Sequence, residues 1–151
     1  PPTSNLRPAV PFELFDENNE RVGLASYLGR HRLLLVFFDA KTGAENDPIV
    51  ERLRRDFNKV KALDLKVFAV STAIPQENRK IIQSAGPFPF PLLSDPGREV
   101  HDRGGVAEGT ADHPTSLLFF IDRAGNVDFG QEAPRPAPEP RKFLDRLLAG
   151  G

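Results

Sequence analysis

The side chains best placed for chemistry are Thr42 and Glu45, which lie three residues apart directly after an apolar stretch, residues 33–38. They precede Asp47 and a proline, a pair typical of a helix start, where a carboxylate is stabilised by the helix dipole and free backbone N–H groups. A polar pocket built on Thr42, Gly43 and Glu45 could bind a small polar ligand or use Glu45 as an acid–base group. The simpler interpretation, which we prefer, is that Glu45 and Asp47 are first-turn acids on a solvated surface.

Histidine beside a carboxylate is a second chemically useful pattern, because such an imidazole can act as a base or a metal ligand. The chain has three histidines, His31, His101 and His113, and two of them form the adjacent pairs His101-Asp102 and Asp112-His113. Their spacing matches no helix-borne metal motif. We therefore interpret them as loop or surface histidines and predict neither a metal ion nor another cofactor.

Serine and cysteine chemistry is restricted by what the sequence lacks. Ser71, Ser94 and Ser116 fall at the ends of predicted strands, where open α/β sheets place ligands. None of them lies in a G-x-S-x-G turn, which disfavours a serine hydrolase. The chain contains no cysteine, so it can form neither a disulfide nor a thiolate metal site, and it has no thiolate to act as a redox nucleophile.

Length and charge indicate one ordinary globular domain. The 151 residues carry a net charge of −1, with Lys and Arg spread along the chain, which gives no electrostatic reason to expect nucleic acid or an anionic membrane surface. No apolar stretch approaches the roughly 20 residues of a membrane span. We expect a poorly structured leader over residues 1–9 and a single domain over residues 10–151. The first residues lack the features of a secretory signal, so a cytoplasmic location is the default expectation.

Two strands and a helix are predicted around the loop of Thr42 and Glu45. The continuous apolar run at residues 33–38 predicts a central strand covered on both faces, and residues 65–70 predict a second buried strand. Asp47 is expected to cap an amphipathic helix that continues to Leu63, because apolar residues recur there at three- and four-residue spacing.

The other predicted elements place this centre in an α/β fold. They are, in chain order, a strand over 12–15 with a return arm over 21–24, a helix starting at 71–75, an extended proline-rich loop over 87–91, a short helix over 96–101, a glycine-rich loop over 104–109, a hairpin of strands 116–121 and 126–129, an extended segment over 133–140, and a final helix with an apolar stripe over 143–148. Strand–helix alternation predicts a parallel centre, and the late hairpin adds antiparallel edges.

Several segments carry a resemblance to a known family, and together they span nearly the whole chain. They are residues 11–16, 18–29, 34–38, 67–71, Phe90-Pro91-Leu92-Leu93-Ser94-Asp95 and Phe119-Phe120-Ile121-Asp122-Arg123-Ala124-Gly125-Asn126-Val127. In their order and spacing the chain resembles the peroxiredoxin branch of the thioredoxin-like superfamily, the alkyl hydroperoxide reductase and thiol-specific antioxidant family. The resemblance implies a thioredoxin-like α/β fold of peroxiredoxin type, a three-layer sandwich whose central mixed sheet is flanked by helices.

The reactive motif of that family is not matched. Its pattern is PxxxTxxC, in which Thr42 fits the threonine and Glu45 stands in place of the cysteine. The proline position is Phe38, or Asp39 if the loop is one residue shorter. Family members also place an arginine about three residues before the phenylalanine of the F-x-I-D turn, and that position is Ser116. Thr42, Glu45 and Ser116 therefore mark a vestigial active-site pocket with no assigned catalytic residue.

These observations predict a redox-inactive relative that serves as a binding or regulatory module, because a carboxylate cannot undergo the oxidation steps of a thiol. One alternative is an enzyme that uses the remodelled pocket around Thr42 and Glu45. Another is a component of an antioxidant system that works through a cysteine-bearing partner. The resemblance implies that a homodimer or another protein partner is to be considered, along with a small polar ligand.

Overall fold

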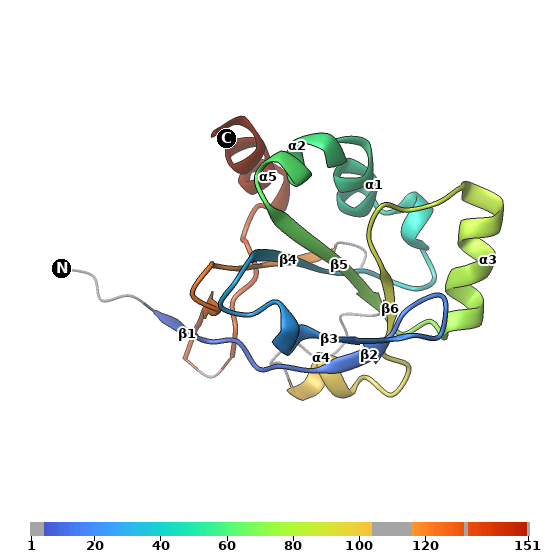
Figure 1. Cartoon of the computed structure of the whole chain (residues 1–151), viewed down its shortest axis with the longest axis horizontal. Helices are drawn as coiled ribbons and strands as arrows, with labels where there is room; N and C mark the ends of the chain where they lie inside the picture. The colour runs from blue at the N-terminus through green and yellow to red at the C-terminus, as the bar shows by residue number, and fades with distance from the viewer. Residues whose placement is uncertain (1–4, 104–115, 132, 151) are drawn as a thin grey trace.

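A mixed β-sheet forms the centre of the molecule in the computed structural model, which describes residues 5–103, 116–131 and 133–150 (Figure 1). Over these residues its eight strands follow the order β1-β8-β7-β4-β5-β6-β2-β3. The elements in chain order are β1 (Leu6–Pro8), β2 (Glu13–Phe15), β3 (Arg21–Gly23), η1 (Leu24–Ser26), β4 (Arg32–Phe37), η2 (Ala44–Asn46), α1 (Pro48–Arg55), α2 (Phe57–Ala62), β5 (Leu65–Ser71), α3 (Pro75–Ala85), β6 (Leu92–Ser94), α4 (Glu99–Arg103), β7 (Leu117–Ile121), β8 (Asn126–Asp128) and α5 (Pro140–Gly150). Strand β4 pairs in parallel with β5 and antiparallel with β7, which confirms the predicted mixed sheet.

Strand β4 is buried on both faces, as its continuous apolar sequence predicted. Leu34 and Val36 belong to the core cluster that includes side chains of α1, α2 and α5. Leu33, Leu35 and Phe37 belong to a second cluster, shared with η1 and α4. Figure 1 shows α1, α2 and α5 on one side of the sheet and α4 on the other. Alternate side chains of one strand thus hold the two outer layers on the central sheet.

One strand forms where none was expected. Residues 6–8, expected in a poorly structured leader, make β1 and pair antiparallel with β8 at one edge of the sheet. Their side chains are exposed, so the sequence carries no apolar pattern that would reveal this strand. Leu92–Ser94, which follows the proline-rich loop and ends at a serine predicted to lie at a strand end, forms β6 and pairs in parallel with β5. All three of its residues are buried.

The final helix and its apolar stripe are confirmed, since Leu144 and Leu148 of α5 are buried in the core. The short helix predicted over 96–101 begins later, at Glu99. The glycine-rich loop predicted over 104–109 lies outside the described residues. No helix in the described part of the chain combines the length and the apolar character needed to cross a membrane.

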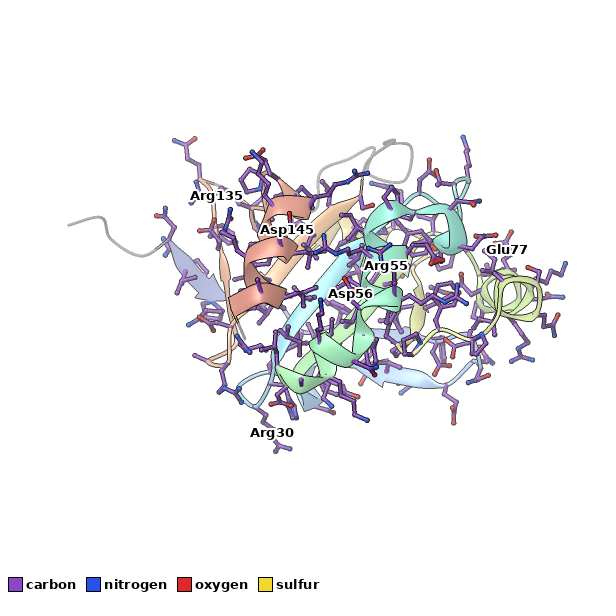
Figure 2. All side chains as sticks on the ribbon, turned by 90° about the horizontal axis from the view of Figure 1, so that it is seen from above. Arg30, Arg55, Asp56, Glu77, Arg135 and Asp145 are labelled. Carbon is purple, nitrogen blue, oxygen red and sulfur yellow. The ribbon has the colours of Figure 1, made fainter. Side chains whose placement is uncertain are left out.

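The helix predicted from Asp47 to Leu63 is divided at Asp56 into α1 and α2. The backbone of Asp56 leaves the α conformation, with φ −97° and ψ 22°, and aspartate is a poor helix former. Its carboxylate accepts a hydrogen bond of 3.0 Å from Nε of Arg52. The same guanidinium lies 2.8 Å from Asp145 on α5, and Figure 2 labels Asp56 and Asp145 on these two parts of the molecule.

Arg52 therefore joins the α1–α2 junction to α5. The hydrogen bond to Asp56 is the main cause that raises the pKa of Arg52 above its ordinary value, with Asp145 contributing and burial opposing. Charge-assisted bonds of a partly buried guanidinium are worth more than an exposed ion pair. This bridge fixes the position of α5 against α1.

We predict that Arg52→Ala lowers the free energy of unfolding by about 1–2 kcal/mol, because it removes both bonds of the bridge. The matched control is Arg55→Ala. The Arg55 side chain is 68% exposed, and its contact with Asp56 is long, at 3.8 Å, so the loss of this side chain should lower the free energy of unfolding by less than about 0.5 kcal/mol. Denaturant unfolding of the two variants measures the difference. Equal losses would show that the bridge to α5 contributes nothing specific.

Candidate functional site

The loop between β4 and α1 is held in a compact turn by Asp39. Its side chain accepts the backbone N–H of Lys41 at 2.9 Å. Its carbonyl accepts the N–H groups of Thr42 and Gly43 at 3.1 and 3.0 Å. The Asn46 side chain closes the other end of the loop by donating to the carbonyl of Thr42 at 3.0 Å. The loop conformation is thus set by local hydrogen bonds, as in turns initiated by aspartate.

Glu45 lies in η2, directly after this turn, and folds back over Gly43. Its Oε1 atom is buried and has no hydrogen-bond partner among the described residues. Gly43 has a φ of 85°, and a Cβ atom at that position would lie 2.3 Å from Glu45 Oε1. Only glycine allows both this backbone conformation and this approach. The sequence analysis named Gly43 as part of the pocket without finding this requirement.

Asp47 is buried rather than solvated, which corrects the preferred interpretation of it as a surface acid. It caps α1 as predicted, accepting the N–H groups of Ile49 and Val50, each at 3.0 Å. Its other oxygen accepts a hydrogen bond from the hydroxyl of Ser116. Asp47 and Ser116 are only 3% and 6% exposed. This bond links the start of α1 to the start of β7, which are 69 residues apart in sequence.

A hollow of about 360 Å³ opens beside this bond. Pro48 and Ile49 of α1 line it together with Ser116, and residues 139–142 at the start of α5 complete its wall. Its surface is largely apolar. The polar residues that line it are Ser116 and, around the start of α5, Glu139, Arg141 and Lys142. The structure therefore offers a concave space of the size that small ligands occupy, at the low end of the usual range.

The residues predicted for the pocket are brought only partly together. Thr42 and Glu45 share one turn, whereas Ser116 is bonded to Asp47 and lines the hollow. The start of α5 completes the wall of the hollow, although none of its residues was predicted for the site. A proline-rich segment followed by an apolar stripe predicted that a helix starts there, but gave no signal that this start reaches the edge of the sheet.

The other strand-end serines are packing groups. Ser71 and Ser94 end the parallel neighbours β5 and β6 and lie opposite each other in register. Both are buried. The Ser71 hydroxyl accepts the N–H of Ala73, and the Ser94 hydroxyl accepts from the Asn78 side chain, each at 3.2 Å. Through these bonds, Ser71 joins the end of β5 to the turn before α3, and Ser94 joins the end of β6 to α3 itself.

His101 is fully buried, so its interpretation as a loop or surface histidine was wrong. Its Nδ1 atom lies 2.6 Å from Asp95, a partner that the sequence analysis did not consider. The same carboxylate oxygen of Asp95 accepts the N–H groups of Val100 and His101, each at 3.0 Å. The His101 ring stands edge-on to Phe37 with centroids 4.8 Å apart, and its Nε2 atom has no partner among the described residues.

The ionisation of Asp95 reflects two opposing effects. Burial disfavours its charged form, but the hydrogen bonds from His101 and Val100 outweigh that effect and hold the pKa of Asp95 below its ordinary value. Because a carboxylate with a lowered pKa stabilises the folded state only while it is charged, this pair joins α4 to the sheet most strongly above that pKa.

His31, the other histidine among the described residues, belongs to an ion pair at the surface. His31 Nδ1 lies 3.2 Å from Asp64 at the surface, and its hydrogen bond is the main cause that lowers the pKa of Asp64. Arg123 is 3.4 Å from the same carboxylate. His113 lies outside the described residues. Over the part of the chain that is described, no group of three His, Cys, Asp or Glu residues could hold a metal ion.

Comparison with known proteins agrees with this architecture. The sequence matches the AhpC/TSA family over residues 6–129. A search of curated proteins gave no match. Peroxidoxin BcpB from Mycobacterium tuberculosis has a similar structure, with a TM-score of 0.71, 21% identity, and coverage of 98% of this chain and 96% of that one.

Two further solved structures extend the comparison. A thiol peroxidase from Chromobacterium violaceum has a TM-score of 0.68 and 18% identity, covering 99% of this chain and 87% of its own. A structure described as a thiol:disulfide interchange protein DsbE from Chlorobium tepidum has a TM-score of 0.67 and 21% identity, covering 98% of each chain. At these identities the likeness shows a shared fold and carries no activity to this chain.

We predict that Asp95→Asn reduces the acid sensitivity of the fold. The contribution of Asp95 is complete above the ordinary carboxyl pKa of 3.8, which applies to the unfolded chain, and is lost as pH falls through the lower pKa of the folded state. Unfolding titrations from pH 7 to pH 2 should therefore show a shallower decline in the variant. Asp128→Asn, at an exposed ion pair, is the control and should keep the original slope. An unchanged slope in Asp95→Asn would contradict the assignment.

Proposed function

Because the chain belongs to the AhpC/TSA family and yet contains no cysteine, we propose that it is a binding or regulatory module rather than a thiol peroxidase. Peroxide reduction by a thiol needs a thiolate nucleophile. Glu45 stands at the position that the resemblance assigns to the cysteine, and a carboxylate cannot be oxidised to a sulfenic acid. The scaffold is kept without the group that performs the usual reaction.

The hollow beside Ser116 is the observation that carries the binding role. Ser116, the position at which the resemblance places an arginine, is one of the residues that line it. Its walls belong to α1 and α5, which Arg52 holds together. A preformed concave space of this kind is the usual form of a small-molecule site. Thr42 and Glu45 lie on the loop that leads into α1; they are not among the residues that line the hollow, and their place at its rim is part of the proposal.

Association with a second copy or with another protein remains part of the proposal. The family resemblance motivates it, and a cysteine-bearing relative as partner would place the chain in an antioxidant system. A cytoplasmic location likewise remains a prediction. A mixed oligomer on size-exclusion chromatography would support the partner version of this function.

A thermal-shift screen tests the binding role. The panel consists of small carboxylates, phosphate, divalent metals, nucleotides, thiols and organic hydroperoxides. A ligand bound to the native state adds about 2.7 kcal/mol of stability at a hundredfold excess over its dissociation constant. We expect at least one stabilising ligand, with the shift reduced in Glu45→Ala or in Pro48→Phe, which fills the hollow. Glu20→Ala, in an exposed turn, is the control and should respond like the wild type.

The same preparation should not consume hydroperoxide when a thiol reductant is supplied. Catalytic loss of the peroxide above the rate in buffer would contradict the proposal. So would a flat ligand screen combined with the absence of any protein partner in a pull-down.

An enzyme of another kind is the second candidate, and the state of Glu45 favours it. Its Oε1 atom is buried against Gly43 and forms no hydrogen bond with a described residue, so no bond holds the carboxyl group back from turning outward to exchange a proton with a substrate, as a general acid–base group must. We predict that any turnover found with chromogenic esters or phosphate esters is abolished in Glu45→Gln, because the amide cannot exchange a proton. Glu20→Gln should leave the rate unchanged. Turnover that survives in Glu45→Gln would remove this candidate.

A further inference from the structure

The hollow between α1 and α5 has walls and charges that select one class of ligand. Pro48, Ile49 and Pro140 supply apolar surface, and Ser116 lies at the end formed by the sheet. Arg141 and Lys142 also line it. We infer that this hollow binds a small carboxylate with an apolar body, its carboxylate beside Arg141 and its body against the apolar walls; this inference rests on the proposed function and specifies the ligand.

The charge balance at the start of α5 favours an anion. Lys142 is paired with Glu139 at 3.2 Å, and both side chains are about two-thirds exposed. Arg141 also lines the hollow, and no ion pair or hydrogen bond joins its side chain to another described residue. The charged side chains that line the hollow therefore sum to one excess positive charge. An incoming anion finds a guanidinium that does not first have to leave another partner.

Asp47 does not oppose this assignment, because its charge is already satisfied. One of its oxygens accepts two backbone N–H groups and the other accepts the Ser116 hydroxyl. A ligand cation would have to displace Lys142 from Glu139 and approach Arg141, which repels it. The sign of the ligand charge thus follows from the paired and unpaired groups at one wall of the hollow.

A carboxylate with an apolar body fits better than an inorganic anion. The guanidinium of Arg141 has a planar fork that can match the two oxygens of a carboxylate. The largely apolar remainder of the surface offers nothing to the other oxygens of phosphate, whereas it gains from contact with a hydrocarbon chain. The volume of about 360 Å³ limits the body to a small one.

Titrations followed by amide NMR of the ¹⁵N-labelled full chain test the inference. The probes are hexanoate, hexylammonium and inorganic phosphate, of which the first two share a chain of six carbons and differ in charge. We expect hexanoate to shift the amide signals of Ile49, Ser116 and Arg141, and to bind at least tenfold more tightly than the other two. Hexylammonium binding as well as hexanoate would overturn the inference, as would hexanoate shifts located elsewhere.

Matched variants test the role of the charge and of the hollow. Arg141→Ala should weaken hexanoate binding about fivefold, the effect of losing an exposed charge pair. Arg146→Ala removes the same charge from the same helix at a position outside the hollow, and it should bind like the wild type. Pro48→Phe should abolish binding by filling the space. An unchanged thermal midpoint without ligand shows that each variant is folded, and equal affinity in Arg141→Ala and Arg146→Ala would overturn the inference.

The outcomes separate this inference from the proposed function. If phosphate or hexylammonium binds and Pro48→Phe abolishes that binding, the module binds a ligand in this hollow but the carboxylate assignment fails. If none of the three probes shifts these amides while another member of the screening panel does, the module again binds a ligand in this hollow, but the carboxylate assignment fails. If no compound and no protein partner binds, both fail.

Discussion

The buried carboxylate of Asp47 is the constraint on which the candidate site depends. Removing a charge from water is costly unless donors replace the lost hydration, and here two backbone N–H groups of α1 and the Ser116 hydroxyl do so. Because of these bonds, the start of α1 is held against the start of β7. The loop of Glu45 directly precedes Asp47 and the hollow lies next to it, so the bonds of the Asp47 side chain help to position both of them.

That constraint is independent of thiol chemistry, which explains how the scaffold persists without cysteine. The turn after β4 is held by Asp39, and the next residues are held by the cap at Asp47. Neither set of bonds involves Glu45, whose Oε1 atom takes no part in them. The position that resembles the reactive one is therefore free to change its chemistry while the backbone around it stays in place, as expected when function resides in a site rather than in a fold.

The parts of this structure that the sequence predicted are those encoded by local patterns. The apolar run of β4 and the stripe of Leu144 and Leu148 follow from burial alone. The hollow joins segments near residues 48, 116 and 141, and no local pattern reports which of them meet. His101 shows the same limit on a shorter scale. Its partner is Asp95, six residues away, because the chain between them turns back, whereas sequence adjacency pointed to Asp102.

Asp47 and Asp95 perform the same task on opposite faces of the sheet, with one difference that separates their behaviour. Each accepts two backbone N–H groups and one side-chain donor. The donor to Asp47 is a hydroxyl, whereas Asp95 accepts from the imidazole of His101, and this bond helps to hold the pKa of Asp95 below its ordinary value. The stabilisation that Asp95 gives to α4 is therefore lost as pH falls through that lowered pKa. The hollow lies on the other face, between helices joined by Arg52, so ligand binding and the stability of α4 are separable properties of this molecule.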